Sequence, residues 1–302
     1  MRDRDHTKMP QGRDIPLLLL GMIGIGTSGP IIALSAMPIL TLIFWRNLFG
    51  TFLMAPFALR HQDFKNPNFR RAALISIGAG TALALHFICF FLAMRYTTVA
   101  AGTALTALQP LFTAYFMVRL GGHIPSRAWI GMVISFIGVL IITGIDFQIS
   151  TRAFIGDICA IACAALAALY MTLGAHAQRT LNTSTYATIC YFICSIEALA
   201  FALIKGDKVV GFAAKEWLLL IALTFGAQIL GHTLFNLTLK RLSPAIVSLV
   251  IFFEAPISAL LAFWWLGQLP PNGTIPGVLV LLFGCVIFVL RNRETESSVK
   301  AQ

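Results

Sequence analysis

The sequence predicts an all-α integral membrane protein with ten transmembrane helices, arranged as two inverted repeats of five helices. Three observations favour this fold class: an apolar composition, ten apolar runs of membrane-spanning length, and a similarity of the sequence to itself at a spacing of 146 residues. Of the 302 residues, 58% are hydrophobic and only 11% are charged. Soluble domains carry about 25% charged residues, so this chain has too few polar side chains to cover a globular surface in water.

The ten apolar runs each approach the roughly 20 residues that a transmembrane helix needs. In chain order they are 16–34, 38–58, 72–93, 97–120, 128–145, 155–175, 186–204, 217–239, 245–266 and 275–290. Most connections between them are short, which predicts antiparallel neighbours. The first run follows four basic residues, so a cleaved signal peptide is the alternative for it. Its length and its place in the repeat favour a retained helix.

The distribution of Lys and Arg predicts the orientation of the helices. With the N-terminus in the cytoplasm, sixteen of these 22 residues lie in cytoplasmic segments, five in outer loops, and Arg46 inside a run. Cytoplasmic loops of membrane proteins carry the excess of basic residues. We therefore expect both termini in the cytoplasm and, for a bacterial protein, a multi-pass location in the inner membrane.

Several classes of function are disfavoured by the sequence. The net charge of +10 comes from bases scattered between apolar runs, whereas nucleic-acid binding needs a clustered basic face. The six cysteines lie in apolar runs without metal-ligand spacing, so we expect them to pack as small apolar residues and expect no metal or cofactor. A membrane-embedded enzyme is an alternative class, but H-E-x-x-H and G-x-S-x-G motifs are absent from the sequence. G-x-x-x-x-G-K-[ST] is also absent, which leaves an ATP-driven pump unsupported.

A shift of 146 residues aligns the third to fifth runs with the eighth to tenth. Residue types that rarely match by chance coincide in this alignment, namely His86 with His232, Arg95 with Arg241, Pro110 with Pro256, Gly131 with Gly277 and Gly138 with Gly284. Two copies of five helices must enter the membrane from opposite sides, because five is odd. Inverted repeats of this kind build the exchangeable states of many secondary transporters around a midplane site.

The repeat also predicts the organisation of the chain. We expect a cytoplasmic N-terminal tail at 1–14, a first repeat at 15–146, a second repeat at 147–291 and a cytoplasmic C-terminal tail at 292–302. Such a protein would work by alternating access, with the lipid bilayer and a small-molecule substrate as its partners.

Two segments carry a family resemblance. The stretch from Ser243 through Glu254-Ala255-Pro256 to Leu266-Gly267, and the stretch from Thr98 through Pro110 to Gly121, resemble the corresponding regions of the EamA family of the drug/metabolite transporter superfamily. Within it the chain most resembles the YddG-type exporters of aromatic amino acids. The resemblance implies ten helices in an inverted repeat and export of aromatic or neutral amino acids. Other members of the family export nucleobases, sulfur metabolites or toxic cations, so these substrates are alternatives. A uniporter is an alternative to an exporter.

Five ionisable residues lie inside the apolar runs, where a charge costs several kcal/mol unless it faces a cavity or a partner. They are Arg46, His86, Glu197, His232 and Glu254. We expect Glu254, near the midplane, to be the main candidate for proton coupling. The two histidines either join it in contacting the substrate and titrating, or serve as neutral packing groups. Arg46 and Glu197 lie at matching depth and are predicted to form a structural ion pair.

Polar stripes on three runs predict a common cavity, because polar side chains in a membrane helix must face inward. Gln228, His232 and Asn236 follow at i, i+4 and i+8 on the eighth run, and Glu254 is followed by Ser258 on the ninth. Thr106, Gln109 and Thr113 form a similar stripe on the fourth run. Phe90, Phe116, Phe225 and Phe235 would supply apolar walls. The predicted substrate-binding residues are His86, Phe90, Thr106, Gln109, Gln228, His232, Asn236, Glu254 and Ser258.

Proline and glycine predict local departures from simple helices. Pro30, Pro110 and Pro256 interrupt runs and can free backbone carbonyls to line a cavity. The glycines at 131, 138, 277 and 284, with Ser135, are typical of close helix packing. The same motif fits contacts inside one chain or a dimer, so we expect a monomer or a weak dimer.

Overall fold

The computed structural model describes residues 10, 12, 14–119, 125–143, 151–242, 244–269 and 274–300. Within these residues every regular element is a helix. Six segments are long and apolar enough to cross a membrane, namely Asp14–Leu34, Ile39–His61, Phe69–Tyr96, Phe154–Ala177, Thr183–Lys205 and Ala214–Thr238. Shorter apolar helices cover Ala128–Ile141, Val250–Leu266 and Ile275–Phe288.

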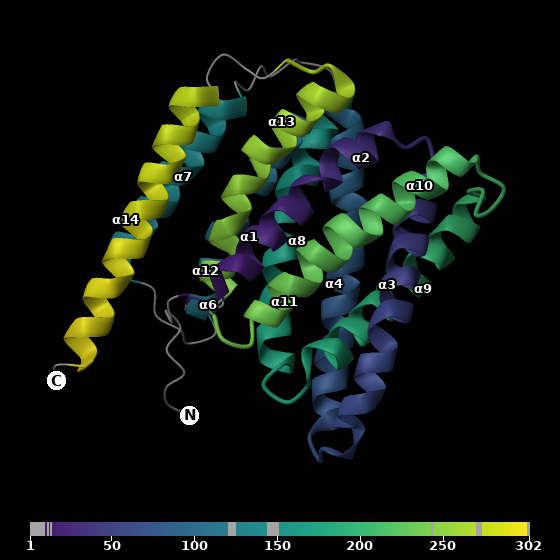
Figure 1. Cartoon of the computed structure of the whole chain (residues 1–302), viewed down its shortest axis with the longest axis horizontal. Coiled ribbons are helices and arrows are strands. Elements are labelled where there is room, and N and C mark those ends of the chain that lie inside the picture. Colours follow the sequence, from purple (N-terminus) through teal and green to yellow (C-terminus); the bar gives the residue numbers. More distant parts are fainter. Residues whose placement is uncertain are drawn as a thin grey trace.

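Four long, unbroken helices form one side of the bundle (Figure 1). The long helices are α3 (Ile39–His61), α4 (Phe69–Tyr96), α8 (Thr151–Ala177) and α9 (Thr183–Lys205). A single turn of 3₁₀-helix, η1 (Asp63–Lys65), connects α3 to α4. Helix α4 packs along α8, and α3 packs along α9.

The remaining interior helices are broken. The first span consists of α1 (Asp14–Gly26) and α2 (Ser28–Leu34), and the predicted run 97–120 holds α5 (Val99–Thr106) and α6 (Gln109–Arg119). Three consecutive pieces form the segment from 214 to 238, namely α10 (Ala214–Leu223), the π-helical η2 (Thr224–Thr233) and α11 (Leu234–Thr238). The segment from 244 to 266 is likewise α12 (Pro244–Leu249), the 3₁₀-helical η3 (Val250–Phe253) and α13 (Glu254–Leu266).

Proline explains three of these breaks. Proline has no N–H, so the carbonyl four residues before it lacks its helical partner. Pro30, Pro110 and Pro256 follow the three discontinuities by two to four residues. The break near Pro30 is used by a neighbouring helix, because Ser258 Oγ in α13 donates to the Gly26 carbonyl oxygen at 2.8 Å. The carbonyl freed at the break in the first span is therefore satisfied by a side chain of another helix.

Two helices, α7 (Ser126–Thr143) and α14 (Thr274–Lys300), lie side by side at one edge of the molecule (Figure 1). Their glycines bring the two backbones into direct contact. A Cβ atom on Gly131 would lie 2.8 Å from the Gly284 carbonyl oxygen, and one on Gly138 would lie 2.8 Å from that of Gly277. The glycine motif thus serves packing between two helices of one chain.

Of the two predicted terminal tails, the C-terminal one is largely helical in the structure. Helix α14 continues to Lys300, past the expected start of the C-terminal tail at 292, because the sequence from 291 to 300 holds no glycine or proline to end a helix. Most of the N-terminal tail, 1–14, lies outside the described residues. Asp14 begins α1 and is buried.

Polar contacts tie the helices together at both ends of the bundle. Near the start of α1, Arg241 forms a salt bridge of 2.5 Å with Asp14. At the opposite end of that span, the Glu216 carboxylate accepts hydrogen bonds from the Ser35 hydroxyl at 2.6 Å and the Met37 amide at 3.3 Å. Glu216 lies in the first turn of α10 and Arg241 lies just after α11, so the two ends of the first span are fastened at the two ends of the segment from 214 to 238.

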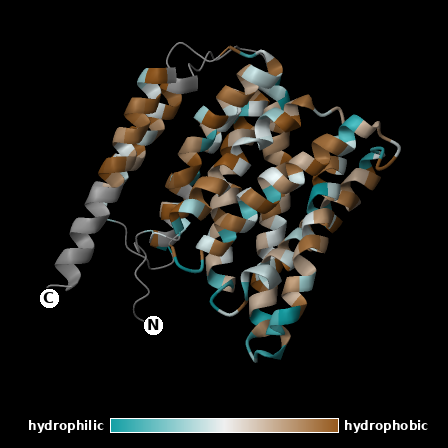
Figure 2. Cartoon of the chain, viewed as in Figure 1, coloured by the Kyte–Doolittle hydropathy of each residue, from teal (hydrophilic) through white to brown (hydrophobic). Residues whose placement is uncertain are grey.

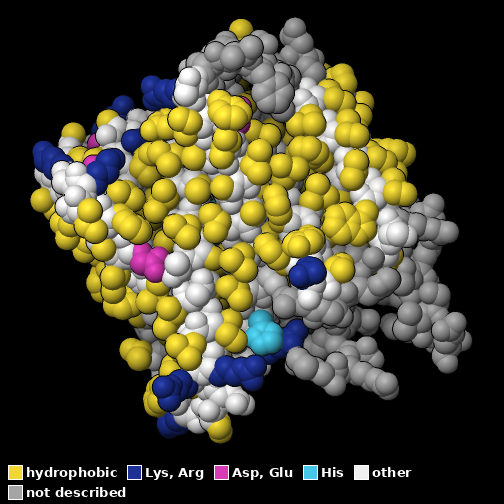
Figure 3. Space-filling view, turned by 180° about the vertical axis from the view of Figure 1, so that it is seen from behind, with side chains coloured by type: hydrophobic (Ala, Val, Ile, Leu, Met, Phe, Trp, Pro, Cys, Tyr) yellow, Lys and Arg dark blue, Asp and Glu magenta, His cyan; other side chains and the backbone are white. Residues whose placement is uncertain are grey.

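The outer surface is strongly apolar. Figure 2 shows hydrophobic residues along the helices and hydrophilic residues mainly at helix ends and connections. On the face seen in Figure 3, hydrophobic side chains cover the middle, and Lys and Arg gather toward its margins. Large hydrophobic side chains such as Ile204, 82% exposed, and Trp264, 70% exposed, face outward. A surface of this composition and extent fits contact with lipid rather than water.

Candidate functional site

An interior cavity lies where the broken helices meet α3, α4 and α8. In this structure its volume, measured as the space open to the centre of a water-sized molecule, is about 30 Å³. Six of the nine predicted substrate-binding residues line it: His86, Phe90, Thr106, Gln109, His232 and Glu254. The wall also contains residues that we did not predict to bind substrate: Ile25, Ser28, Arg46, Phe87, Ala167, Tyr170, Met171 and Ile251. Both halves of the chain therefore contribute polar groups to one enclosed space.

The two histidines related by the sequence repeat meet in this cavity. The ring centroids of His86 and His232 are 6.0 Å apart, at an edge-to-face angle of 73°. Both residues are buried, with 9% and 7% of their surface exposed. His86 Nδ1 lies 3.1 Å from the Cys163 carbonyl oxygen, which fixes the ring against α8. The two histidines that the repeat aligns thus share one interior space.

Arg46 lies in the cavity wall and does not pair with Glu197. Its Nε donates to Gln228 Oε1 at 2.6 Å, whereas Glu197 accepts a hydrogen bond of 2.7 Å from Thr81 Oγ1. The predicted ion pair is wrong, because matching depth along two helices does not fix which faces they present. The Arg46 guanidinium carbon lies 4.1 Å from the centroid of the Phe87 ring, so a cation–π contact covers one of its faces.

Three predicted binding residues lie behind the cavity wall. Gln228 is hydrogen bonded to Arg46 and, through Nε2, to Asn47 Oδ1 at 3.0 Å. Asn236 Nδ2 donates to the Tyr170 hydroxyl at 2.6 Å, and Ser258 is bonded to Gly26 as described above. These side chains position wall residues and the break between α1 and α2.

The π-helical segment explains why the polar stripe divides. The i, i+4 spacing aligns side chains on one face of an α-helix, but η2 has the wider turn of a π-helix. Gln228 consequently points to α3, His232 to the cavity, and Asn236, in α11, to α8. The helical periodicity of the sequence does not reveal this change from α-helix to π-helix.

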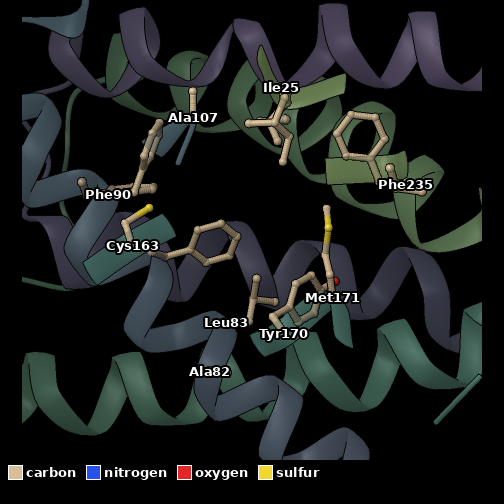
Figure 4. Close-up of a cluster of buried hydrophobic side chains, with 14 of the residues drawn as sticks. Ile25, Ala82, Leu83, Phe90, Ala107, Cys163, Tyr170, Met171 and Phe235 are labelled. Atoms are coloured by element: carbon tan, nitrogen blue, oxygen red, sulfur yellow. The ribbon is translucent and has the colours of Figure 1, made fainter. Parts of the chain in front are cut away.

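The apolar part of the wall comes from α1, α4, α8 and η3. Figure 4 shows Ile25, Phe90, Tyr170 and Met171 around a common interior space. Of the four phenylalanines expected in the wall, only Phe90 lines the cavity. Phe225 is 54% exposed, and Phe235 is buried against Gly21 in α1. Phe87, one turn before Phe90, supplies the aromatic surface instead.

Glu254 begins α13 and is 4% exposed. Glu254 begins a new helix because Pro256 has no N–H to continue the hydrogen bonding from η3. Glu254 and Arg46 both line the cavity, but within the described residues they form no salt bridge with each other. The cavity thus presents one acidic and one basic side chain at separate positions in a mostly apolar wall.

The described residues contain no group of three or more His, Cys, Asp or Glu side chains suited to hold a metal ion. All six cysteines are free thiols. Their burial or partial burial between helices agrees with the expected packing role.

An all-helical bundle with several membrane-spanning segments, an apolar outer surface and a buried cavity of mixed polarity defines a multi-pass membrane protein of the transporter class. The sequence model of the EamA-like transporter family matches residues 13–144 and again residues 154–290. The chain belongs to this family. The family resemblance seen in the sequence is therefore confirmed.

Named relatives and a solved structure agree with this assignment. The chain is 23% identical over 257 residues to the pseudopaline exporter CntI of Pseudomonas aeruginosa, covering 84% of this chain and 87% of the exporter. It is 21% identical over 290 residues to the uncharacterised transporter YxxF of Bacillus subtilis, covering 94% and 92%. A crystal structure that is 19% identical matches with a TM-score of 0.72, covering 94% of this chain and 97% of the other, and shows the same fold.

These relatives fix the class and leave the cargo open. They are transporters of bacterial membranes, which places this multi-pass chain in the inner membrane. None of the relatives named here is of the YddG type, so the finer resemblance to aromatic amino acid exporters stays a prediction.

Proposed function

We propose that the protein is a secondary transporter that exports small organic metabolites, foremost aromatic and neutral amino acids, across the inner membrane by alternating access. The observation that carries this proposal is the cavity, because it is enclosed by both halves of the chain and combines an apolar wall with a few placed polar groups. Substrate sites of small molecules have this composition.

We further propose ten spanning helices in two inverted repeats, with both termini in the cytoplasm. Two observations support this arrangement. The family model matches the chain twice, in segments of similar length. The contacts also correspond in pairs, since α4 packs on α8 while η2, in the segment equivalent to α4, packs on α1, the equivalent of α8.

Counterflow tests the transport proposal. Purified protein is reconstituted into liposomes loaded with unlabelled phenylalanine, and uptake of labelled phenylalanine is measured against empty liposomes. We expect uptake that saturates with concentration and is competed by other neutral amino acids. Absence of flux for every member of a panel of amino acids, nucleobases, sulfur metabolites and organic cations would refute a metabolite transporter.

Proton coupling is proposed to use Glu254, with His86 and His232 as neighbouring groups. A carboxyl group facing a buried cavity can exchange a proton for substrate when the cavity opens to either side. We expect an outward-directed amino acid gradient to move protons in the opposite direction, and Glu254→Gln to exchange substrate at a reduced rate without proton movement. Asp157→Asn, on α8 outside the cavity, is the matched control. Flux that is insensitive to a proton gradient, and unchanged in Glu254→Gln, would favour the uniporter alternative. Proton movement that persists in Glu254→Gln would instead contradict the role of Glu254.

A further inference from the structure

Two polar atoms of the cavity wall are buried without a hydrogen-bond partner in the described protein. They are Nη2 of Arg46 and Oγ of Ser28. Only 1% of Arg46 and 3% of Ser28 is exposed, and both residues line the same cavity. An unpaired buried guanidinium donor is costly, so a group that enters the cavity is the natural acceptor.

The rest of the Arg46 side chain is held in place. Its Nε is bonded to Gln228 Oε1 at 2.6 Å, and Gln228 is itself fixed by Asn47 at 3.0 Å. The Phe87 ring covers one face of the guanidinium at 4.1 Å. The terminal donors are therefore presented by a group whose orientation is already fixed, which lowers the entropy lost when an acceptor binds.

The acceptor that best suits this group is a carboxylate. A guanidinium is planar and permanently charged, and its paired N–H donors match the two oxygens of a carboxylate. Gln228 contributes an amide and no negative charge, so the positive charge of Arg46 lacks a salt-bridge partner within the described residues. An arriving anion would supply both the charge and the acceptor oxygens.

The opposite charge in the wall is Glu254. Its carboxyl makes no hydrogen bond or salt bridge inside the described part of the chain, although the residue is 4% exposed and lines the cavity. The other polar wall groups, including His86, His232 and Tyr170, are bonded to or packed on their neighbours. Arg46 and Glu254 are thus the two charged groups available to a solute.

We propose that Arg46, assisted by the Ser28 hydroxyl, binds the carboxylate of the transported solute, and that Glu254 faces its ammonium group. The inference rests on the proposed transport function and narrows its substrate class to α-amino acids and related zwitterions. Phe87, Phe90 and Tyr170 would then surround the apolar side chain of such a solute.

Three probes that share one phenyl group test the assignment: L-phenylalanine, 3-phenylpropionate without the ammonium, and phenethylamine without the carboxylate. Binding to purified protein is measured by calorimetry and flux in proteoliposomes. For the unmodified protein we expect phenethylamine to bind at least about tenfold more weakly than phenylalanine, since a charge-assisted bidentate contact is lost. Arg46→Gln should weaken phenylalanine and phenylpropionate by a similar factor and leave phenethylamine unchanged.

Matched variants separate the binding role from a structural one. Arg152→Gln removes an exposed arginine outside the cavity and should change none of the three affinities. Arg46→Lys keeps the charge without the planar fork, so it should still prefer phenylalanine to phenethylamine, with lower affinity. This variant and the comparison of probes on the unmodified protein decide the question even where Arg46→Gln does not fold.

Equal binding of phenylalanine and phenethylamine by the unmodified protein overturns the inference, as does an Arg46 variant that weakens all three probes alike. In either case flux persists and the transport proposal stands. Absence of flux for the whole metabolite panel instead refutes the transport proposal, and this inference with it.

Discussion

Arg46 is held by neutral neighbours, and this accounts for its place in the bundle. Gln228 accepts from its Nε and donates to Asn47, so three residues on two elements form one chain of hydrogen bonds. Buried polar groups of this kind are strongly coupled, because removing one member leaves the others unsatisfied.

Gln228→Leu should therefore destabilise the protein well beyond the loss of one contact. It leaves Arg46 Nε and Asn47 Oδ1 buried without partners, and each unsatisfied group costs about 1–3 kcal/mol. Thermal unfolding in detergent measures the effect. Gln268→Leu, at an exposed position, is the control with the same change of side chain. Equal melting temperatures for the two variants would contradict the hydrogen-bonded arrangement.

At the scale of single residues, the sequence identified some residues of the cavity wall and missed others. His86, His232 and Glu254 were identifiable because ionisable groups inside apolar runs are rare. Ser28 was not, because a serine in a membrane helix is common and only the break before Pro30 turns it to the cavity. The role of Arg46 was missed for a different reason, since its partner proved to be the neutral Gln228, which no charge pattern reveals.

At the scale of elements, the extent of the helices was predictable and their winding was not. Every predicted run in the described residues contains helix, because composition and length alone determine which stretches cross a membrane. The turn between α5 and α6 agrees with the expectation from Pro110. The π-helical η2 carries no proline in its own sequence, TFGAQILGHT, and its widened turns depend on contacts with α1 and α3 that only the assembled bundle provides.

Gly138→Val should separate α7 from α14. The added side chain would meet the Gly277 carbonyl oxygen and the Leu281 backbone, the nearest of which cannot move without shifting the helix. Overpacking of this type costs about 1–3 kcal/mol. The control is Gly78→Val in α4, where an added Cβ lies 4.0 Å from its nearest neighbour, Leu173 Cδ1. A melting temperature that falls equally in both variants would point to helix propensity in place of the close approach.

At the scale of the whole molecule, the two ends of the first span are fastened differently. One end depends on a salt bridge between Asp14 and Arg241, and the other on hydrogen bonds to the Glu216 carboxylate. If the protein alternates between two openings, these contacts must form and break in turn.

Asp14→Asn should favour the state that is open at the Asp14 end. Cys163 is buried beside His86, with its sulfur 3.2 Å from Nδ1, and can report access to the interior. In a variant that keeps Cys163 as its only cysteine, we expect Asp14→Asn to raise the rate of labelling by a small water-soluble thiol reagent severalfold. Asp207→Asn breaks the salt bridge with Lys205, two residues away on the same chain segment, and should leave the rate unchanged. An unaltered rate in Asp14→Asn would argue against a closing role for this salt bridge.

The proposed topology makes a further prediction for the whole chain. Reporter tags fused before residue 14 and after residue 300 should both be protected from reagents added outside intact cells, whereas a tag inserted at 206–212, between α9 and α10, should react. Reaction of either terminal tag would contradict the inverted arrangement with both ends in the cytoplasm.

The edge position of α7 and α14 has a consequence for how selectivity can change. No described residue of either helix lines the cavity, and their backbones already touch through glycine. Mutational searches for new cargo can therefore leave this pair untouched and concentrate on α1 to α4, α8 and the proline-flanked breaks. Conversely, adapting the protein to a thicker or thinner bilayer can act on the pair without altering what the interior recognises.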